Sequence, residues 1–315
     1  MLKYFKPLPI FILGWALLLC TPLFSDISLI NGLAQLALFA VVVCLPAWKT
    51  GRLSYVDIGW PLGLAVIGLV TLLMAEGDPL RKSVVGCVYL FIGLRMGLTA
   101  LKMLRLGAFD TELPRYQFQR RRWEKAGKTN TMLAIQVDAV LQGLANASFL
   151  CAPAFVIAMN PNPEISPLEV FGLVLWLAAF AMETIADKQK VAFMREMKQR
   201  GEKGKVCNVG LWRYSRHPNY FAEWMVWNAL VIAAIPSFIE LYSAMPLINW
   251  VLIGASLMYA SFIMYNTLVI FTGAIPSEYY SVQKRPDYKQ YQQETNMFFP
   301  GPVKTGVENT LEETR

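Results

Sequence analysis

The chain has 315 residues, of which 55% are hydrophobic and 16% are charged, whereas soluble domains carry about a quarter charged residues. This composition favours one bundle of membrane-spanning helices over the roughly two soluble domains that the length alone suggests. The 29 Lys and Arg outnumber the 22 Asp and Glu, but they lie between apolar segments rather than on one continuous face, which argues against a nucleic-acid partner. The five cysteines include no C-x-x-C pair, so no disulfide framework or metal site is predicted.

Eight apolar segments of the chain approach the length of about 20 residues that a helix needs to cross a bilayer. They are Leu8 to Phe24, Ile27 to Trp48, Tyr55 to Met74, Ser83 to Leu104, Thr131 to Ala158, Leu168 to Ala186, Phe221 to Ile239 and Leu247 to Phe271. We therefore predict an all-α polytopic transmembrane helix bundle of about eight helices. Residues 1–302 would form a single transmembrane domain and residues 303–315 a flexible polar tail. Lys3 and Lys6 precede the first segment without a following cleavage pattern, so we interpret it as an uncleaved helix.

The distribution of Lys and Arg in the loops predicts the orientation, because these residues accumulate on the cytosolic side of a membrane. They are frequent between residues 105 and 128 and between residues 188 and 216, and they are missing from loops 160–167 and 240–246. Both termini are then cytosolic. We expect an integral multi-pass protein of a bacterial inner membrane rather than of the endoplasmic reticulum.

Arg81 and Lys82 are the exception to this orientation, because they fall in a loop that it assigns to the outer side. Glu76 and Asp78 are close enough in the sequence to offset their charge. This loop weakens the predicted orientation of the first half of the chain.

Polar side chains at membrane depth are costly, so they usually face a partner or a cavity. Asp138, Gln142 and Asn146 recur every four residues, which places them on one face of the fifth predicted helix. This face could form the polar wall of a substrate cavity, or its side chains could make interhelical hydrogen bonds that hold the bundle together. The spacing is compatible with both interpretations.

A dense group of polar residues follows the sixth predicted helix. Glu183 and Asp187 lie four residues apart at its end, and taken alone they would be a salt-bridged helix end. The only histidine, His217, lies between Arg216 and Pro218, and the proline forces an extended or turn geometry on it. The next helix begins there, and helix N-termini and Arg forks both suit phosphate or carboxylate groups. The segment therefore predicts an anion site at the membrane edge, although a structural histidine and arginines that anchor lipid head groups are the alternative.

The chain after the eighth predicted helix carries a second polar group, which includes Glu278, Arg285 and Tyr291. If both ends of the chain are cytosolic, this segment can close over the same site. No G-x-G-x-x-G or Walker loop is present, so any nucleotide must be held by helices and loops.

Residues 210–221, Gly-Leu-Trp-Arg-Tyr-Ser-Arg-His-Pro-Asn-Tyr-Phe, closely resemble the signature of a family of uncharacterised membrane proteins grouped with the steroid 5-alpha-reductases. Val56 to Trp60, Glu183 to Asp187 with Gln189, and Ser277 to Pro300 resemble the same family in the same order. The resemblance covers most of the chain and implies an all-helical reductase. NADPH would lie among the last helices and cytosolic loops, and a hydrophobic substrate would lie in a lipid-accessible cavity.

The resemblance implies a cofactor site within residues 183–300. Its members would be Glu183, Asp187, Arg195, Lys205, Arg213, Arg216, His217, Asn219, Tyr220, Glu223 and Glu278. Arg195, Lys205, Arg213 and Arg216 are expected at the phosphates, His217 and Asn219 at the ribose or the nicotinamide amide, and Tyr220 in packing or a hydrogen bond. Asp187, Glu223 and Glu278 would orient these cations and hydroxyls. Glu183, Ala222 and Glu278 depart from the usual Asn, Gly and His of the related enzymes.

In this interpretation NADPH supplies hydride to the beta carbon of an electron-poor double bond such as an enone, while an acid supports the carbonyl oxygen. The steroid reductases use a carboxyl and tyrosine pair from early helices as this acid, and the sequence shows no matching pair. Asp57 and Tyr89 are the candidate catalytic residues, because both lie early in the chain and could face inward, where a buried carboxyl can stay protonated. Asp57 could instead cap its helix.

Two other functions stay open. The Arg-His-Pro-x-Tyr pattern also resembles the S-adenosylmethionine site of membrane isoprenylcysteine methyltransferases. A non-enzymatic protein that binds membrane lipids is the third hypothesis. The Glu183 to Asp187 pair and the C-terminal segment resemble the reductases more closely.

Overall fold

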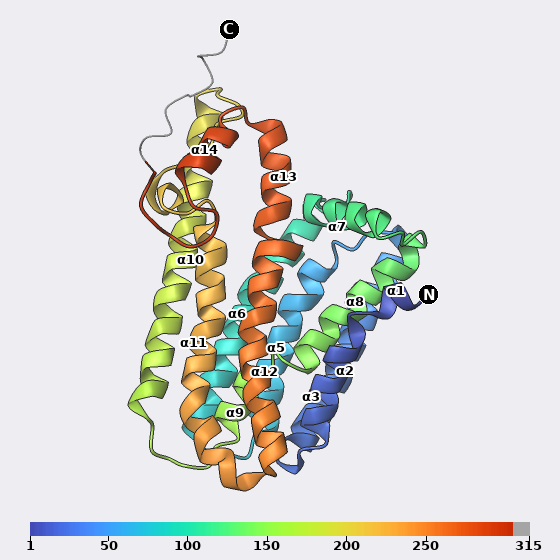
Figure 1. The fold of residues 1–315 in the computed structure, drawn as a ribbon, viewed down its shortest axis with the longest axis vertical. Coiled ribbons are helices and arrows are strands. Elements are labelled where there is room, and N and C mark those ends of the chain that lie inside the picture. The colour runs from blue at the N-terminus through green and yellow to red at the C-terminus, as the bar shows by residue number, and fades with distance from the viewer. Residues whose placement is uncertain (305–315) are drawn as a thin grey trace, which may run out of the picture. The chain divides into compact units, whose positions relative to one another are not determined.

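The computed structural model describes residues 1–304, which form helices and no strand (Figure 1). Its α-helices are α1 (Leu2–Phe5), α2 (Leu8–Leu19), α3 (Ser25–Phe39), α4 (Leu45–Thr50), α5 (Val56–Met74), α6 (Pro79–Arg105), α7 (Pro114–Lys125), α8 (Thr131–Ala147), α9 (Ala152–Ala158), α10 (Pro167–Gln199), α11 (Pro218–Glu240), α12 (Leu247–Asn266), α13 (Ala274–Lys284) and α14 (Tyr288–Glu294). Short 3-10 turns lie at Pro22–Phe24, Gly210–Arg213 and Leu241–Ala244, and π-helical turns at Ala40–Cys44 and Thr267–Phe271. The predicted all-α class is confirmed.

Seven stretches of the described chain are long and apolar enough to cross a membrane. They are Pro22–Thr50, Val56–Met74, Pro79–Arg105, Thr131–Ala158, Pro167–Gln199, Pro218–Ala244 and Leu247–Lys284. The first predicted span is represented by the shorter apolar helix α2, which agrees with a prediction of about eight helices. The chain is therefore an integral multi-pass membrane protein, and the side on which each terminus lies stays a prediction.

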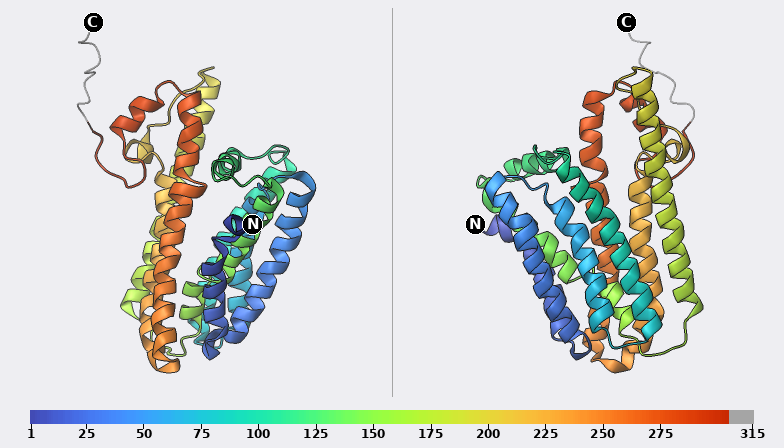
Figure 2. Two further views of the ribbon diagram at one scale, coloured as in Figure 1. Left: turned by 45° about the vertical axis from the view of Figure 1, so that its right-hand side comes forward. Right: turned by 180° about the vertical axis from the view of Figure 1, so that it is seen from behind.

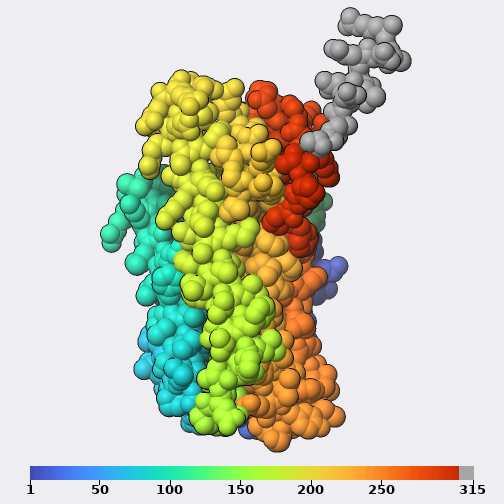
Figure 3. Space-filling view, turned by 90° about the vertical axis from the view of Figure 1, so that its left-hand side faces the viewer, coloured from blue at the N-terminus to red at the C-terminus, as the bar shows by residue number. Residues whose placement is uncertain are grey.

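Helix α10 continues well beyond its predicted end at Ala186. The residues that follow are mostly good helix formers, and the helix ends just before Gly201, whose φ of 72° suits the left-handed conformation that stops helices. Val174, Leu177 and Ile185 of α10 are exposed, and Figure 3 shows this helix at the surface. Exposed apolar side chains of this kind suit contact with lipid.

Contacts divide the described chain into two compact units. The first contains Met1–Leu173 and Leu230–Phe262, and the second contains Val174–Ala229 and the described residues from Ile263 onward. Residues 305–315, which make up most of the predicted polar tail 303–315, lie outside the described residues.

Helices α5 and α6 of the first unit lie side by side (Figures 1 and 2). Glycines allow their backbones to approach closely: a Cβ at Gly93 would lie 2.3 Å from the Ala65 nitrogen, and one at Gly68 would lie 2.5 Å from the Gly86 carbonyl oxygen. Small residues at such contacts are typical of helix packing in membranes, where close van der Waals contact replaces the hydrophobic effect.

The polar face of α8 makes interhelical hydrogen bonds. The Asn146 amide donates to the Gln35 side chain at 3.3 Å and to the Trp60 carbonyl at 3.2 Å, and Gln119 of α7 donates to Asp138 at 3.1 Å. These bonds support the second of the two interpretations of this face, in which it holds helices together.

The exception in the loop charges also has a structural explanation. Arg81 pairs with Glu169, with Nε and Oε2 3.0 Å apart and both side chains almost fully buried. Asp78 caps the start of α6. Its carboxylate accepts hydrogen bonds from the backbone nitrogens of Leu80 and Arg81 at 3.0 Å. The main partner of Arg81 is thus a residue far away in the sequence, which the local offset by Glu76 and Asp78 does not anticipate.

Candidate functional site

The turn that begins the signature segment is fixed to α10 in the second unit. Gly210 has a φ of 54°, and a Cβ there would lie 2.5 Å from the Gln189 side chain, so this position requires glycine. Gln189 accepts a hydrogen bond from the Leu211 nitrogen at 2.9 Å, and the Trp212 ring nitrogen donates to the Ala186 carbonyl at 2.8 Å. The conspicuous glycine and tryptophan of the segment therefore serve to dock it on α10.

Arg216 forms a buried fork with Glu278 of α13. Its Nε lies 2.7 Å from Oε1 and its Nη2 lies 3.1 Å from Oε2. The remaining terminal nitrogen, Nη1, donates to the Gln292 carbonyl at 3.0 Å and to the Thr295 carbonyl. Arg216 thus joins the start of α11 to α13 and to the chain around α14, with all three of its nitrogens bonded to protein.

His217 lies against the same carboxylate and is 3% exposed. Its Nε2 is 3.2 Å from Oε1 of Glu278, and because an ionised carboxylate can only accept, Nε2 carries the proton and donates it. The ring stacks on Tyr220, with ring centroids 5.3 Å apart and an angle of 2° between the planes. Burial lowers the pKa of His217 below its usual value, although the hydrogen bond to Glu278 acts in the opposite direction.

We expect His217 to contribute to a loss of stability at acid pH. In the unfolded chain it takes up a proton near its ordinary pKa of 6.5, whereas burial lowers the pKa in the folded protein. The unfolded state therefore binds more protons in this pH range. The stability that buried, neutral His217 contributes is complete above pH 6.5 and is lost as the pH falls from 6.5 towards the lowered pKa of the folded protein. The variant His217→Gln keeps a donor for Glu278. The difference between the unfolding temperatures of the wild type and this variant should shrink as the pH is lowered from about 8 to about 5. A difference between the two that does not change with pH would contradict this assignment.

The chain after α14 folds back onto the signature segment. The Ser215 hydroxyl donates to the Phe298 carbonyl at 2.8 Å, the Gly301 nitrogen donates to the Tyr214 carbonyl at 3.0 Å, and the Tyr291 hydroxyl donates to the Trp212 carbonyl. These bonds confirm the prediction that the C-terminal segment closes over the segment around His217.

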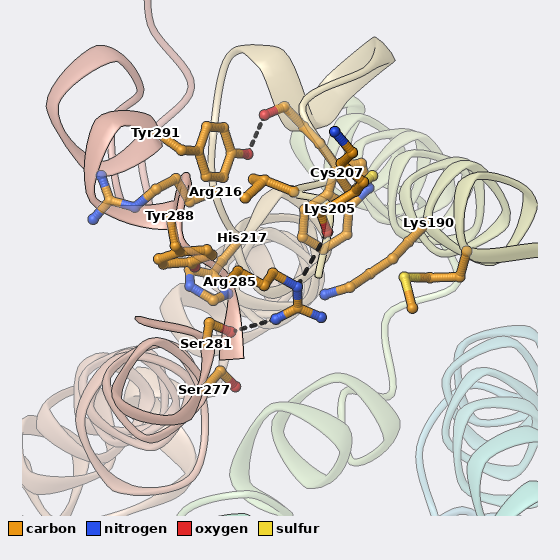
Figure 4. Close-up of a pocket in the computed structure, with 13 residues that line it drawn as sticks. Lys190, Lys205, Cys207, Arg216, His217, Ser277, Ser281, Arg285, Tyr288 and Tyr291 are labelled. Carbon is orange, nitrogen blue, oxygen red and sulfur yellow. Dashed lines mark hydrogen bonds between the residues drawn. The ribbon is translucent and has the colours of Figure 1, made fainter. Parts of the chain in front are cut away.

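A narrow pocket lies between these elements (Figure 4). Its cationic side chains are Lys190, Lys205, Arg216 and Arg285, its hydroxyl groups belong to Ser277, Ser281, Tyr288 and Tyr291, and no carboxylate is among its lining residues. The cavity volume is about 40 Å³. Burial raises the pKa of both Tyr288 and Tyr291, so both hydroxyls stay protonated, and that of Tyr291 donates to the Trp212 carbonyl. The pocket is therefore built to receive a small anionic group.

Two of the cations are held by neighbouring groups. Arg285 donates from Nε to the Lys205 carbonyl at 3.2 Å and from Nη1 to the Ser281 hydroxyl at 3.0 Å. The Lys190 ammonium lies 4.1 Å from the centre of the Trp212 ring, a favourable cation–π arrangement. Beside them, burial raises the pKa of the Cys207 thiol, while Lys190 and Arg285 act to lower it.

Asn219 and Asp187, both predicted cofactor-site residues, contact each other. The Asn219 amide nitrogen donates to Oδ1 of Asp187 at 3.0 Å. The amide oxygen of Asn219 is buried and accepts no hydrogen bond within the described part of the chain, which is costly unless a ligand or water supplies a donor. This oxygen is a candidate acceptor for a ligand.

A second, wider pocket of the same unit has a cavity volume of about 390 Å³ and shares Lys205, Val206 and Tyr291 with the narrow one. It also contains the aromatic ring of Phe193 and the carboxylates of Glu202, Asp287 and Glu294. Its size and mixed polarity suit a neutral group with hydroxyls better than a phosphate.

The structure brings together only part of the predicted site. Lys205, Arg216 and His217 line the narrow pocket, whereas Arg195 and Arg213 are exposed and line neither pocket. Glu183 of α10 and Glu223 of α11 are half-buried members of the same unit. Lys190 and Arg285 were not among the predicted site residues. The sequence could have indicated Lys190, because it lies three residues after Asp187 and so on the same side of the helix.

The predicted catalytic residues Asp57 and Tyr89 both belong to the first unit, but they bond to different groups. Asp57 accepts from the Tyr116 hydroxyl at 2.5 Å and pairs with Arg115 at 3.2 Å, so it bonds to side chains of α7 rather than serving as the cap of α5. The Tyr89 hydroxyl donates to the Leu150 carbonyl at 2.8 Å. The tyrosine that accompanies Asp57 is therefore Tyr116, which the sequence did not single out.

The fold and the pocket define an all-helical membrane protein with a narrow pocket of cationic and hydroxyl side chains among its last helices. Residues 44–295 match the family described as a protein of unknown function, DUF1295. Because the match covers most of the chain, the protein belongs to this family of membrane proteins. Comparison with curated proteins and with solved structures finds no match.

Proposed function

We propose that the protein is a membrane-embedded NADPH-dependent reductase of a carbon–carbon double bond in a hydrophobic substrate, such as a steroid-like or lipid enone. The observation that carries the proposal is the narrow pocket, which contains Lys190 and Arg285 and no carboxylate among its lining residues, while its Lys205 pairs with Glu202 at 3.5 Å. The charge of Arg216 is balanced by Glu278. An excess of fixed positive charge supports a ligand with several negative charges, as NADPH has.

The same observation weighs against S-adenosylmethionine. That cofactor carries a sulfonium and an ammonium group against one carboxylate, so a pocket with the excess positive charge of Lys190 and Arg285 would repel it. The resemblance of residues 210–221 to both enzyme groups does not separate the two cofactors, whereas the pocket's charge favours the reductase.

The residues present fit a phosphate-bearing cofactor with an amide group. The pocket cations would bind phosphate, and the buried amide oxygen of Asn219 would accept a hydrogen bond from a carboxamide or a hydroxyl. Bound NADPH would supply a hydride to the beta carbon of the substrate's double bond, and the alpha carbon would gain a proton. Asp57 and Tyr89 remain the proposed acids that support the carbonyl oxygen, and Tyr116 joins them because its hydroxyl bonds to Asp57.

Unfolding of the purified full-length protein in detergent tests the proposal. NADPH at a hundred times its dissociation constant should add about 2.7 kcal/mol to the free energy of unfolding, and S-adenosylmethionine should add nothing. Asn219→Ala should weaken NADPH binding at least about tenfold, because a buried acceptor is removed. Stabilisation by S-adenosylmethionine alone would favour the methyltransferase. Stabilisation by neither cofactor would favour a non-enzymatic lipid-binding protein.

A further inference from the structure

The narrow pocket brings two cationic side chains from distant parts of the sequence into one space. Lys190 is on α10 and Arg285 follows α13, and Figure 4 shows the Lys190 side chain pointing towards the Arg285 guanidinium. The pocket lining contains no carboxylate, and the attraction of Asp187 for Lys190 is weaker than the repulsion between Lys190 and Arg285. Like charges in a partly buried site repel each other, so an anion between them would stabilise the arrangement.

Both cations are positioned before any ligand arrives. Arg285 is fixed on one side by the Lys205 carbonyl and on another by Ser281. Lys190 is held over the Trp212 ring, which is itself hydrogen-bonded to α10. Side chains that are already ordered lose less conformational entropy on binding, which strengthens and sharpens anion recognition.

The size of the pocket limits the group that can enter. Its cavity volume is about 40 Å³, which at roughly 10–15 Å³ for each water is space for about three waters or for one phosphoryl group. A nucleoside does not fit. The wider pocket, with a cavity volume of about 390 Å³, adjoins it through Lys205, Val206 and Tyr291 and has space for the nucleoside to which such a phosphoryl group is attached.

The charge of the pocket favours a terminal phosphate monoester over a bridging pyrophosphate. A phosphate monoester carries a charge of about −1.5 to −2 at neutral pH, which matches the two positive charges of Lys190 and Arg285. Each phosphorus of a bridging pyrophosphate carries a single charge and is substituted on two sides, so it matches a closed pocket with two cations less well. A terminal phosphate monoester is the better fit.

We infer that Lys190 and Arg285 form the subsite for the 2′-phosphate of NADPH and that this subsite makes the protein select NADPH over NADH. The inference rests on the proposed function, because it assigns a role within the same cofactor site. It adds the two residues that determine which nicotinamide cofactor is bound.

The test compares the dissociation constants of NADPH and NADH for the purified full-length protein in detergent. Lys190→Gln and Arg285→Gln should each lower the preference for NADPH at least about tenfold, because each removes a charge-assisted hydrogen bond to the 2′-phosphate. The affinity for NADH should stay unchanged. The matched controls are Lys188→Gln and Lys284→Gln, which remove exposed charges next to the same positions and should keep the preference.

Competition with 2′,5′-ADP and 5′-AMP provides a second measurement that involves no nicotinamide. The wild type should bind 2′,5′-ADP more tightly, and the two pocket variants should lose this difference. A variant that weakens NADPH and NADH equally, or a wild type that binds both cofactors alike, would overturn the inference and leave the reductase proposal in place. A wild type that binds neither cofactor would overturn both.

Discussion

Replacing Glu278 with alanine is expected to lower the free energy of unfolding by about 3–5 kcal/mol, because it leaves the buried charge of Arg216 without its partner. The two side chains are only 9% and 10% exposed, and Nε of Arg216 lies 2.7 Å from Oε1 of Glu278. His217 and Gln292 donate to the same carboxylate, so both would also lose an acceptor.

Unfolding of the purified variants by denaturant or heat in detergent measures this effect. Glu196→Ala is the matched control, because Glu196 pairs with Arg200 in an exposed i,i+4 pair of a kind that contributes about 0.3–0.5 kcal/mol. A cycle with Arg216→Met isolates the pair, since the double variant should lose less stability than the sum of the single variants. Equal, small losses for Glu278→Ala and Glu196→Ala would show that the fork does not stabilise the fold.

The fork changes the role that the sequence indicated for Arg216. The Arg-His-Pro pattern suggested that its guanidinium binds phosphate, but each of its three nitrogens donates to Glu278 or to a backbone carbonyl. Arg216 is therefore a positioning residue in this structure. It holds α13, which carries Ser277 and Ser281 of the narrow pocket, against the start of α11.

The parts of the fold that depend on local composition could be predicted from the sequence. Long apolar segments give the helices and their approximate limits, and Gly210 and Pro218 mark the turn and the helix start between which His217 lies. The extension of α10 to Gln199 was missed because its last turns are polar, and polarity ends a predicted membrane span without ending a helix.

The pairings within the sites could not be predicted, because they join residues that are far apart in the sequence. Nothing near Lys190 indicates that it faces Arg285, and nothing near Asp57 indicates that its hydroxyl partner is Tyr116 of α7 rather than Tyr89. Such contacts depend on how helices pack, which periodicity in a single sequence does not specify. The segment containing His217 was recognisable because its unusual residues are neighbours in the chain.

Arg81 shows the same limit in the first unit, and its partner carries the second large expected effect. Replacing Glu169 with alanine should lower the free energy of unfolding by about 3–5 kcal/mol, because Arg81 would stay buried without a counter-charge. The side chains are 0% and 3% exposed, so this pair is more deeply buried than that of Arg216 and Glu278. Arg81 also donates to the Glu164 carbonyl, a bond that cannot balance its charge.

Glu164→Ala provides the matched control, because Arg81 bonds to the backbone of Glu164 and not to its carboxylate. Unfolding in detergent should show little change for Glu164→Ala and a large loss for Glu169→Ala, and similar losses for both would contradict the assignment. If the large loss is found, the charge of Arg81 is neutralised within a buried pair and is not a free positive charge of the loop. A paired charge of this kind should not count in the balance of Lys and Arg that orients the helices, and the apparent conflict with the predicted topology then disappears.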